Sequence, residues 1–169
     1  MRMKIKTLFF FVILFSGFAL GKADDYIVLN KTSKVYDQPN AKYVTENQNG
    51  DEVEAISGMV FKYTEHTPGW YKIEYSPGLH AFIPEQIIAD NLSQPTPGTY
   101  NIANNPDESV FITDNGEWIC KTENNSLKGI EKENIVLFLN NQDIITYSLV
   151  NLDNGPIVIN YDNEVTKFF

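Results

Sequence analysis

The chain has few of the residues that build disulfides and metal centres. Its 169 residues include one cysteine and two histidines. A single cysteine excludes a disulfide within the chain and a zinc site built from several thiolates. Basic residues are also few, with 13 lysines and arginines against 22 aspartates and glutamates. Because nucleic acid and anionic lipid headgroups repel so acidic a chain, we expect neither as a partner.

Long apolar runs are missing beyond the first 20 residues. The opening segment has bases within 1–6, an apolar run over 8–20, and the small residues Gly21 and Ala23. This three-part pattern predicts a signal peptide at 1–23 that is removed after Ala23. The alternative is an uncleaved membrane anchor, for which the run is short, since a transmembrane helix needs about 20 apolar residues.

Cleavage would change the charge of the protein. It would remove four bases and no acids, which leaves nine bases against 22 acids, a net charge of −13. We therefore expect a secreted, soluble protein, periplasmic or extracellular, with no stable membrane insertion after cleavage.

The remaining chain predicts an all-β protein in two halves. The segment 93–98 contains Pro95, Pro97 and a glycine in a polar setting, which is typical of a linker. It separates an N-terminal domain at 24–92 from a second small β domain at 99–169. Because the linker is short, we expect the two halves to pack together.

Alternation of apolar and polar residues is the main sign of strands. Within 70–75, Tyr71, Ile73 and Tyr75 share one face of a predicted strand, and Trp70 lies on the other. A half-buried strand requires this period of two residues.

The second half predicts six or seven strands in a small antiparallel barrel or a meander, and we assign it to no family. Asn-Gly pairs at 114–116 and 153–155 predict hairpin turns. Helix is limited to one expected turn at 85–91 and a short helix at 126–134. The predicted strands lie near 99–103, 109–114, 117–123, 134–140, 143–152 and 156–162, with a further one at 164–169.

Three stretches of the first half resemble a known family. They are Ser-Lys-Val-Tyr-Asp-Gln-Pro at 33–39, Asn-Gly-Asp-Glu-Val-Glu-Ala at 49–55, and Gly-Trp-Tyr-Lys-Ile-Glu-Tyr at 69–75, which is followed by Ala-Phe-Ile-Pro at 81–84. In their order and spacing, residues 27–89 resemble a bacterial SH3-like (SH3b) domain. The resemblance implies a small β barrel.

The same resemblance implies binding rather than catalysis. SH3b domains often belong to secreted envelope proteins and bind cell-wall peptide, glycan or a protein partner. The groove would lie between the loop after Tyr36 and the loop before Trp70, and Tyr36, Trp70 and Pro84 occupy the matching positions. The alternative is that these side chains belong to the core, where most aromatic residues are buried.

The residues of catalysis are sparse and scattered. Cys120 lies in a predicted strand of the second half, while His66 and His80 belong to the first. We therefore predict no enzyme, no catalytic residue, no metal site and no cofactor. Two alternatives stay open. One is a ligand-binding or enzymatic site in the C-terminal β domain, and the other is an acidic inhibitor or assembly partner of a basic protein.

Overall fold

A computed structural model describes residues 26–111, 116–121 and 126–161. These residues form thirteen β-strands and one short 3₁₀ turn, η1 (Glu85–Ile87). The prediction of an all-β fold is confirmed, and η1 lies where a single helical turn was expected. The predicted signal peptide, the turn at 114–116 and the strand at 164–169 lie wholly or largely outside the described residues. No helix in the described ranges is long and apolar enough to cross a membrane.

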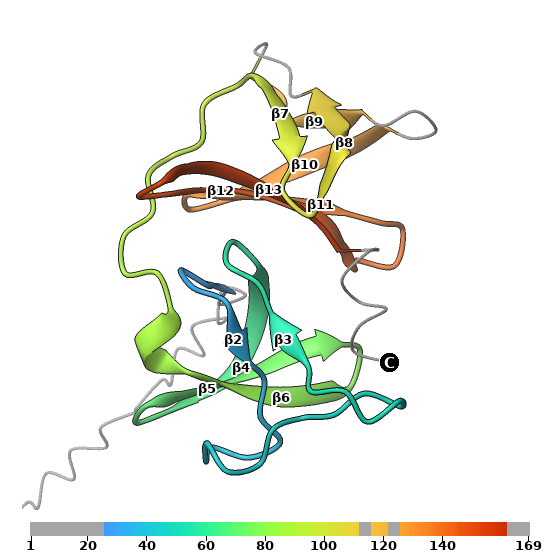
Figure 1. The fold of residues 1–169 in the computed structure, drawn as a ribbon. Helices are drawn as coiled ribbons and strands as arrows, with labels where there is room; N and C mark the ends of the chain where they lie inside the picture. The colour runs from blue at the N-terminus through green and yellow to red at the C-terminus, as the bar shows by residue number, and fades with distance from the viewer. Residues whose placement is uncertain (1–25, 112–115, 122–125, 162–169) are drawn as a thin grey trace, which may run out of the picture.

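The first half consists of a four-stranded antiparallel sheet and a two-stranded ladder (Figure 1). The sheet has the order β1 (Tyr26–Val28), β4 (Val60–Thr67), β5 (Trp70–Ser76) and β6 (Leu79–Pro84), and the ladder pairs β2 (Ser33–Lys34) with β3 (Glu54–Ala55). Backbone hydrogen bonds join Tyr36 to Phe82 in both directions, at 3.0 and 2.7 Å. The chain after β2 therefore continues onto the outer edge of β6.

Strand β5 shows the predicted alternation. Ile73 is fully buried, and Tyr71 and Tyr75 pack against the same hydrophobic cluster. Trp70 and Lys72 belong to the opposite face, because neighbouring residues of a strand point to opposite sides.

The second half is a closed barrel of seven consecutive strands. They are β7 (Thr99–Ile102), β8 (Asn105–Phe111), β9 (Ile119–Lys121), β10 (Ser126–Lys132), β11 (Ile135–Leu139), β12 (Ile145–Leu152) and β13 (Gly155–Asn160). Each strand pairs antiparallel with the next, and β13 closes the barrel by pairing parallel with β7. The expected small barrel is confirmed, and its one parallel pair follows from the strand number, because an up-and-down barrel with an odd number of strands must contain one.

The short helix expected at 126–134 is wrong, because this segment forms β10. Gly129 explains the outcome. A Cβ added to it would lie 2.6 Å from the Cβ of Trp118 and 2.9 Å from side-chain atoms of Val136 and Phe138. The neighbouring strands thus approach this backbone closely, and pairing on both sides of β10 overrides the weak helical tendency of the segment.

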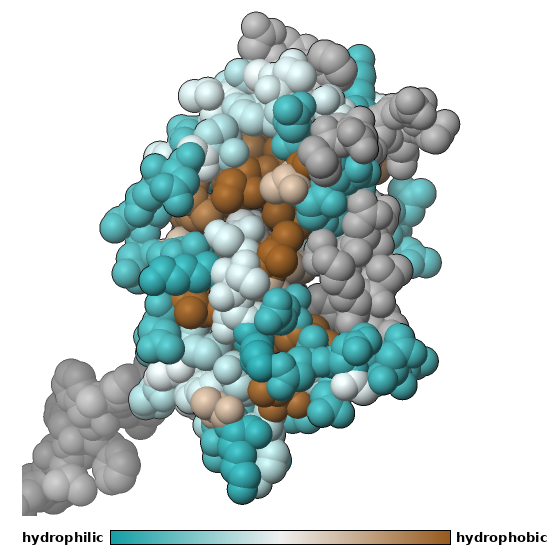
Figure 2. Space-filling model, in the orientation of Figure 1, coloured by the Kyte–Doolittle hydropathy of each residue, from teal (hydrophilic) through white to brown (hydrophobic). Residues whose placement is uncertain are grey.

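The two halves pack together, as expected. One hydrophobic cluster combines Ile27 and Leu29 of the first half with Ile159 and Tyr161 of the second. Another joins Val28 and Val60 to residues of β11 and β12. On the face shown in Figure 2, hydrophobic residues gather over the lower part of the barrel, toward the first half. The halves therefore share apolar surface in addition to the chain that joins them.

The predicted linker lies against the barrel. Ser93 forms a β-bridge with Asn151, and Pro95 is buried. The amide of Gln94 donates a hydrogen bond of 2.8 Å to Glu131 on β10. The segment 93–98 is thus attached at several points along its length.

Candidate binding surface

The fold brings Tyr36, Trp70 and Pro84 together. Trp70 begins β5 and lies directly opposite Pro84, which ends β6. The ring of Tyr36 meets the ring of Trp70 edge to face, with centroids 5.2 Å apart and planes at 85°. All three residues are partly exposed. They therefore lie on the outer face of the sheet rather than in the core.

Phe82 belongs to the same surface, although it is not among the site residues predicted from the sequence. It is partly exposed, lies two residues before Pro84, and is joined to Tyr36 by backbone hydrogen bonds. Residues two apart on a strand share a face, and this places Phe82 beside Pro84. We call Tyr36, Trp70, Phe82 and Pro84 the aromatic surface.

A carboxylate holds the turn beside this surface. Glu85 accepts a hydrogen bond of 3.0 Å from the amide of Gly69, and the Glu85 amide donates one of 2.9 Å to the Gly69 carbonyl. Its other oxygen lies 3.1 Å from Nε2 of His66, whose ring stacks on Tyr71 at 4.3 Å. His66 lies near the end of β4. Since Trp70 follows Gly69 directly in the chain, these bonds between Glu85 and Gly69 restrain the backbone that leads into Trp70.

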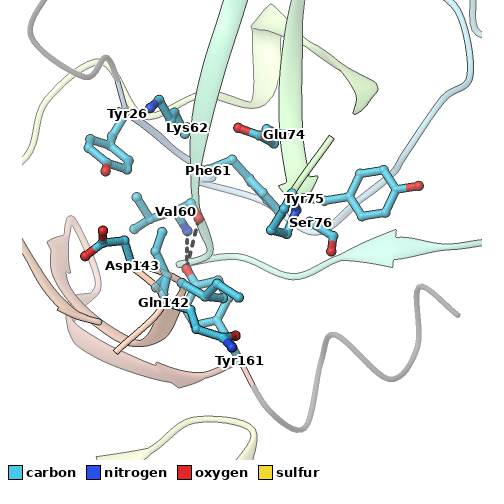
Figure 3. A pocket seen from close by; sticks show the side chains of 13 residues that line it. Tyr26, Val60, Phe61, Lys62, Glu74, Tyr75, Ser76, Gln142, Asp143 and Tyr161 are labelled. Atoms are coloured by element: carbon cyan, nitrogen blue, oxygen red, sulfur yellow. Dashed lines mark hydrogen bonds between the residues drawn. The ribbon is translucent and has the colours of Figure 1, made fainter. Parts of the chain in front are cut away.

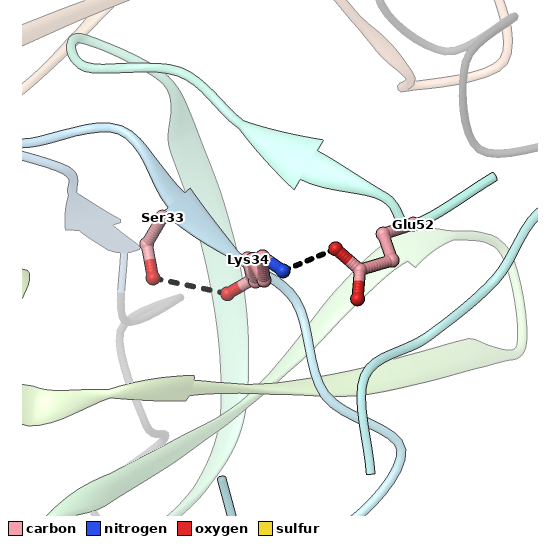
Figure 4. A network of polar contacts seen from close by, with 3 residues as sticks. All are labelled: Ser33, Lys34 and Glu52. Atoms are coloured by element: carbon pink, nitrogen blue, oxygen red, sulfur yellow. Dashed lines mark hydrogen bonds and ion pairs between the residues drawn. The ribbon is translucent and has the colours of Figure 1, made fainter. Parts of the chain in front are cut away.

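The ladder that leads into Tyr36 carries an exposed ion pair between Lys34 and Glu52 (Figure 4). This hydrogen-bonded contact raises the pKa of Lys34. The hydroxyl of Ser33 donates to the Lys34 carbonyl at 3.0 Å. One residue past Tyr36, Asp37 accepts a hydrogen bond of 2.8 Å from Thr45. The chain on both sides of Tyr36 is thus held by polar contacts.

Two tyrosines of β5 have pKa values raised by their surroundings. Burial raises the pKa of Tyr71, and the carboxylates of Glu85 and Asp90 raise it further. Burial also raises the pKa of Tyr75, with a smaller contribution from Asp37. Both phenols therefore ionise at a higher pH than a tyrosine in solution does.

The C-terminal half has a cavity of about 380 Å³ between the segment 94–97 and the barrel. Glu131 lies in its wall and uses both carboxylate oxygens, one for Gln94 at 2.8 Å and one for the indole of Trp118 at 3.2 Å. The polar groups of this cavity thus attach the linker to the barrel. Cys120 is 1% exposed in the barrel core.

Within the described ranges, no three histidine, cysteine, aspartate or glutamate side chains converge as metal ligands would. Comparison with known protein families, with curated proteins and with solved structures finds no match to this chain. The candidate function therefore depends on the residues themselves.

Proposed function

We propose that this chain is a secreted, non-catalytic protein of the bacterial envelope. Its first half acts as an SH3b-like module that binds a cell-wall peptide or glycan, or an envelope protein, through the aromatic surface. The observation that carries this proposal is the meeting of Tyr36, Trp70 and Pro84 on the outer face of the sheet, with part of each side chain in solvent. The signal-peptide pattern at 1–23 supports the location.

The chemistry of these side chains suits binding. Tyrosine and tryptophan combine a large apolar ring with a hydrogen-bonding group, and they are the residues most enriched among those that dominate interface energies. Tyr36 and Trp70 already pack against each other in the free protein. A surface arranged in advance loses little conformational entropy when a ligand binds, so its contact area contributes more fully to affinity.

Retention by insoluble peptidoglycan tests the proposal. The protein from residue 24 onward is mixed with peptidoglycan, and the bound fraction is compared with that of the Trp70→Ala and Leu79→Ala variants. Leu79 is a matched control, because it is 41% exposed and begins β6, the strand that Pro84 ends. We expect W70A to reduce retention severalfold and L79A to leave it unchanged, with circular dichroism confirming the fold of each variant.

Two outcomes would count against the proposal. Equal retention of the wild type and W70A would remove the aromatic surface from the binding site. If the folded wild type is not retained at low or moderate salt, peptidoglycan is not the ligand. Crosslinking in the native envelope would then identify a protein partner, which W70A should fail to capture.

The charge of the protein favours a second candidate, an acidic inhibitor or assembly partner of a basic protein. The chain after residue 23 has nine bases against 22 acids. Binding of this kind depends on long-range attraction, which salt screens, so it weakens steeply as ionic strength rises. Binding through the aromatic surface depends on apolar contact and changes little. A salt series on any captured partner therefore separates the two.

A further inference from the structure

A second cavity lies at the junction of the two halves. It has a volume of about 300 Å³ and opens between the β1–β4–β5 face of the sheet and the β11–β12 hairpin (Figure 3). This is the lower end of the range for pockets that bind small molecules. At about 30 Å³ for each water of the liquid, it would hold roughly ten water molecules. None of its lining residues belongs to the aromatic surface.

The base of this cavity is apolar and firmly held. Val60 and Phe61 are buried, and Ile144 and Ile145 add partly buried aliphatic surface from the hairpin. Tyr161 lies at the bottom and is hydrogen bonded to the backbone of Val60, as Figure 3 shows. Since both halves supply walls and their junction is bonded, the cavity is formed before any ligand arrives.

The charges around the opening are unequal. Lys62 and Glu74 lie directly opposite each other on β4 and β5, and the Glu74 carboxylate accepts a hydrogen bond of 2.9 Å from the Gly78 amide. Lys62 already takes part in an interaction of its own. Asp143 is left. It is exposed, and its carboxylate has no hydrogen bond or ion pair to any described residue.

The hairpin turn presents Asp143 at an unusual backbone angle. Its φ is +59°, in the left-handed region that aspartate tolerates better than most residues. The Asn140 side chain accepts hydrogen bonds from the amides of Gln142 and Ile144, at 2.8 and 3.1 Å, and so fixes the turn. The backbone at Asp143 is therefore held by a bonded turn, and its side chain is exposed at the opening. In Figure 3, Tyr26 and Asp143 appear on the same side of Val60.

From this apolar lining and the unbonded carboxylate of Asp143 at its opening, we infer that the cavity is a binding site for a small amphipathic amine. The apolar part of the ligand lies on Ile144 and Ile145, the partly exposed aliphatic side chains of the lining. Its ammonium group pairs with Asp143, and the face of Tyr26 offers a second favourable contact for a cation. This site is separate from the proposed peptidoglycan-binding surface and does not depend on it.

Three probes of similar shape and different charge test this inference on the full mature chain. They are phenethylamine, 2-phenylethanol and 3-phenylpropanoate, each titrated while backbone amide resonances are followed by NMR. We expect the amine to bind most tightly and the carboxylate least, with the largest shift changes at Val60, Phe61 and Ile144. Asp143→Asn should weaken amine binding by about three- to fivefold, which is the size expected of an exposed ion pair, and leave the alcohol unchanged.

Asp153→Asn is the matched control, since Asp153 is an exposed aspartate of the next hairpin turn and lies outside this cavity. Asparagine also tolerates the left-handed region, so D143N keeps the turn. Equal affinity for amine and alcohol, shift changes elsewhere, or equal effects of D143N and D153N would each overturn the inference. Probe binding that appears only after Phe168→Ser and Phe169→Ser would assign the cavity to the chain's own last residues and overturn it as well.

Discussion

The hydroxyl of Tyr161 is bonded to both backbone polar groups of Val60. The Val60 amide donates to it at 2.5 Å, and the hydroxyl donates to the Val60 carbonyl at 3.1 Å. The Ser148 hydroxyl lies 3.1 Å from the same oxygen. Residues 101 apart in the sequence are thus joined in a buried contact between the barrel and the sheet. These bonds fix how the halves meet, and so they also form the floor of the cavity at the junction.

Tyr161→Phe should destabilise the protein by about 1–3 kcal/mol, because it leaves a buried backbone amide without an acceptor. The ring and its packing remain, so the fold should be retained. Urea denaturation followed by circular dichroism measures the loss. Tyr43→Phe, at an exposed tyrosine, is the control and should change the free energy of unfolding by less than about 0.5 kcal/mol. A Y161F protein as stable as the control would show that the hydroxyl does not hold the halves together.

The same tyrosine predicts a loss of stability at alkaline pH. Burial raises the pKa of Tyr161 well above its ordinary value near 10, so the folded protein keeps this phenol neutral where the unfolded chain ionises it. The stabilisation is complete below about pH 10 and decreases as the pH rises above it, by up to about 1.4 kcal/mol per pH unit. Urea midpoints between pH 8 and 11 measure this slope.

Other groups contribute to that slope, so the difference between wild type and Y161F isolates Tyr161. The raised pKa values of Tyr71, Tyr75 and Lys34 act in the same direction and are common to both proteins. We expect the stability advantage of the wild type to shrink above pH 10. A constant advantage up to pH 11 would contradict the raised pKa of Tyr161.

The close approach of Gly58 to Ile157 predicts a second sensitive point of the junction. Gly58 has a φ of +90°, and a Cβ there would lie 2.8 Å from Cγ2 of Ile157 in the barrel. Gly69 has nearly the same φ, +84°, but nothing within 4 Å. Each Gly→Ala change costs about 1–2 kcal/mol for the backbone angle. G58A should cost a further 1–3 kcal/mol, roughly, for overpacking.

Chemical denaturation of G58A and G69A separates the cost of the backbone angle from the cost of overpacking. Combining G58A with Ile157→Ala, which removes the Cγ2 methyl that the new Cβ would meet, should be less destabilising than the two single changes would predict together. Strict additivity of G58A and I157A, or equal losses in G58A and G69A, would show that the halves do not meet closely at this point.

These relationships also show what the sequence could predict. The strand at 70–75 was correctly assigned to its faces, and the turn at 153–155 was found, because both depend on residues close together in the chain. In that turn the positive φ falls on Gly155. The grouping of Tyr36, Trp70 and Pro84 was expected from a resemblance to a known family.

What the sequence did not reveal depends on distant partners. The segment 126–132 forms a strand because Gly129 fits beneath Trp118 and Phe138, which no local pattern records. The contact of Tyr161 with Val60 likewise arises between residues far apart in the chain. Asp143 looked like one acid among 22, and its place at a cavity follows from the junction of two halves.

Glu85 is predicted to act as a positioning residue for the aromatic surface. It accepts a hydrogen bond from the Gly69 amide and lies within hydrogen-bond distance of His66, and so it holds the turn that precedes Trp70. Glu85→Ala should destabilise the protein by about 0.5–1.5 kcal/mol, the usual contribution of such a bond. It should also speed hydrogen exchange of the Gly69 amide and reduce retention by peptidoglycan. Glu85→Gln keeps an acceptor oxygen and should restore most of the protection at Gly69. If E85A leaves both the exchange and the retention unchanged, the turn is held by its backbone bonds alone and Glu85 has no part in placing Trp70.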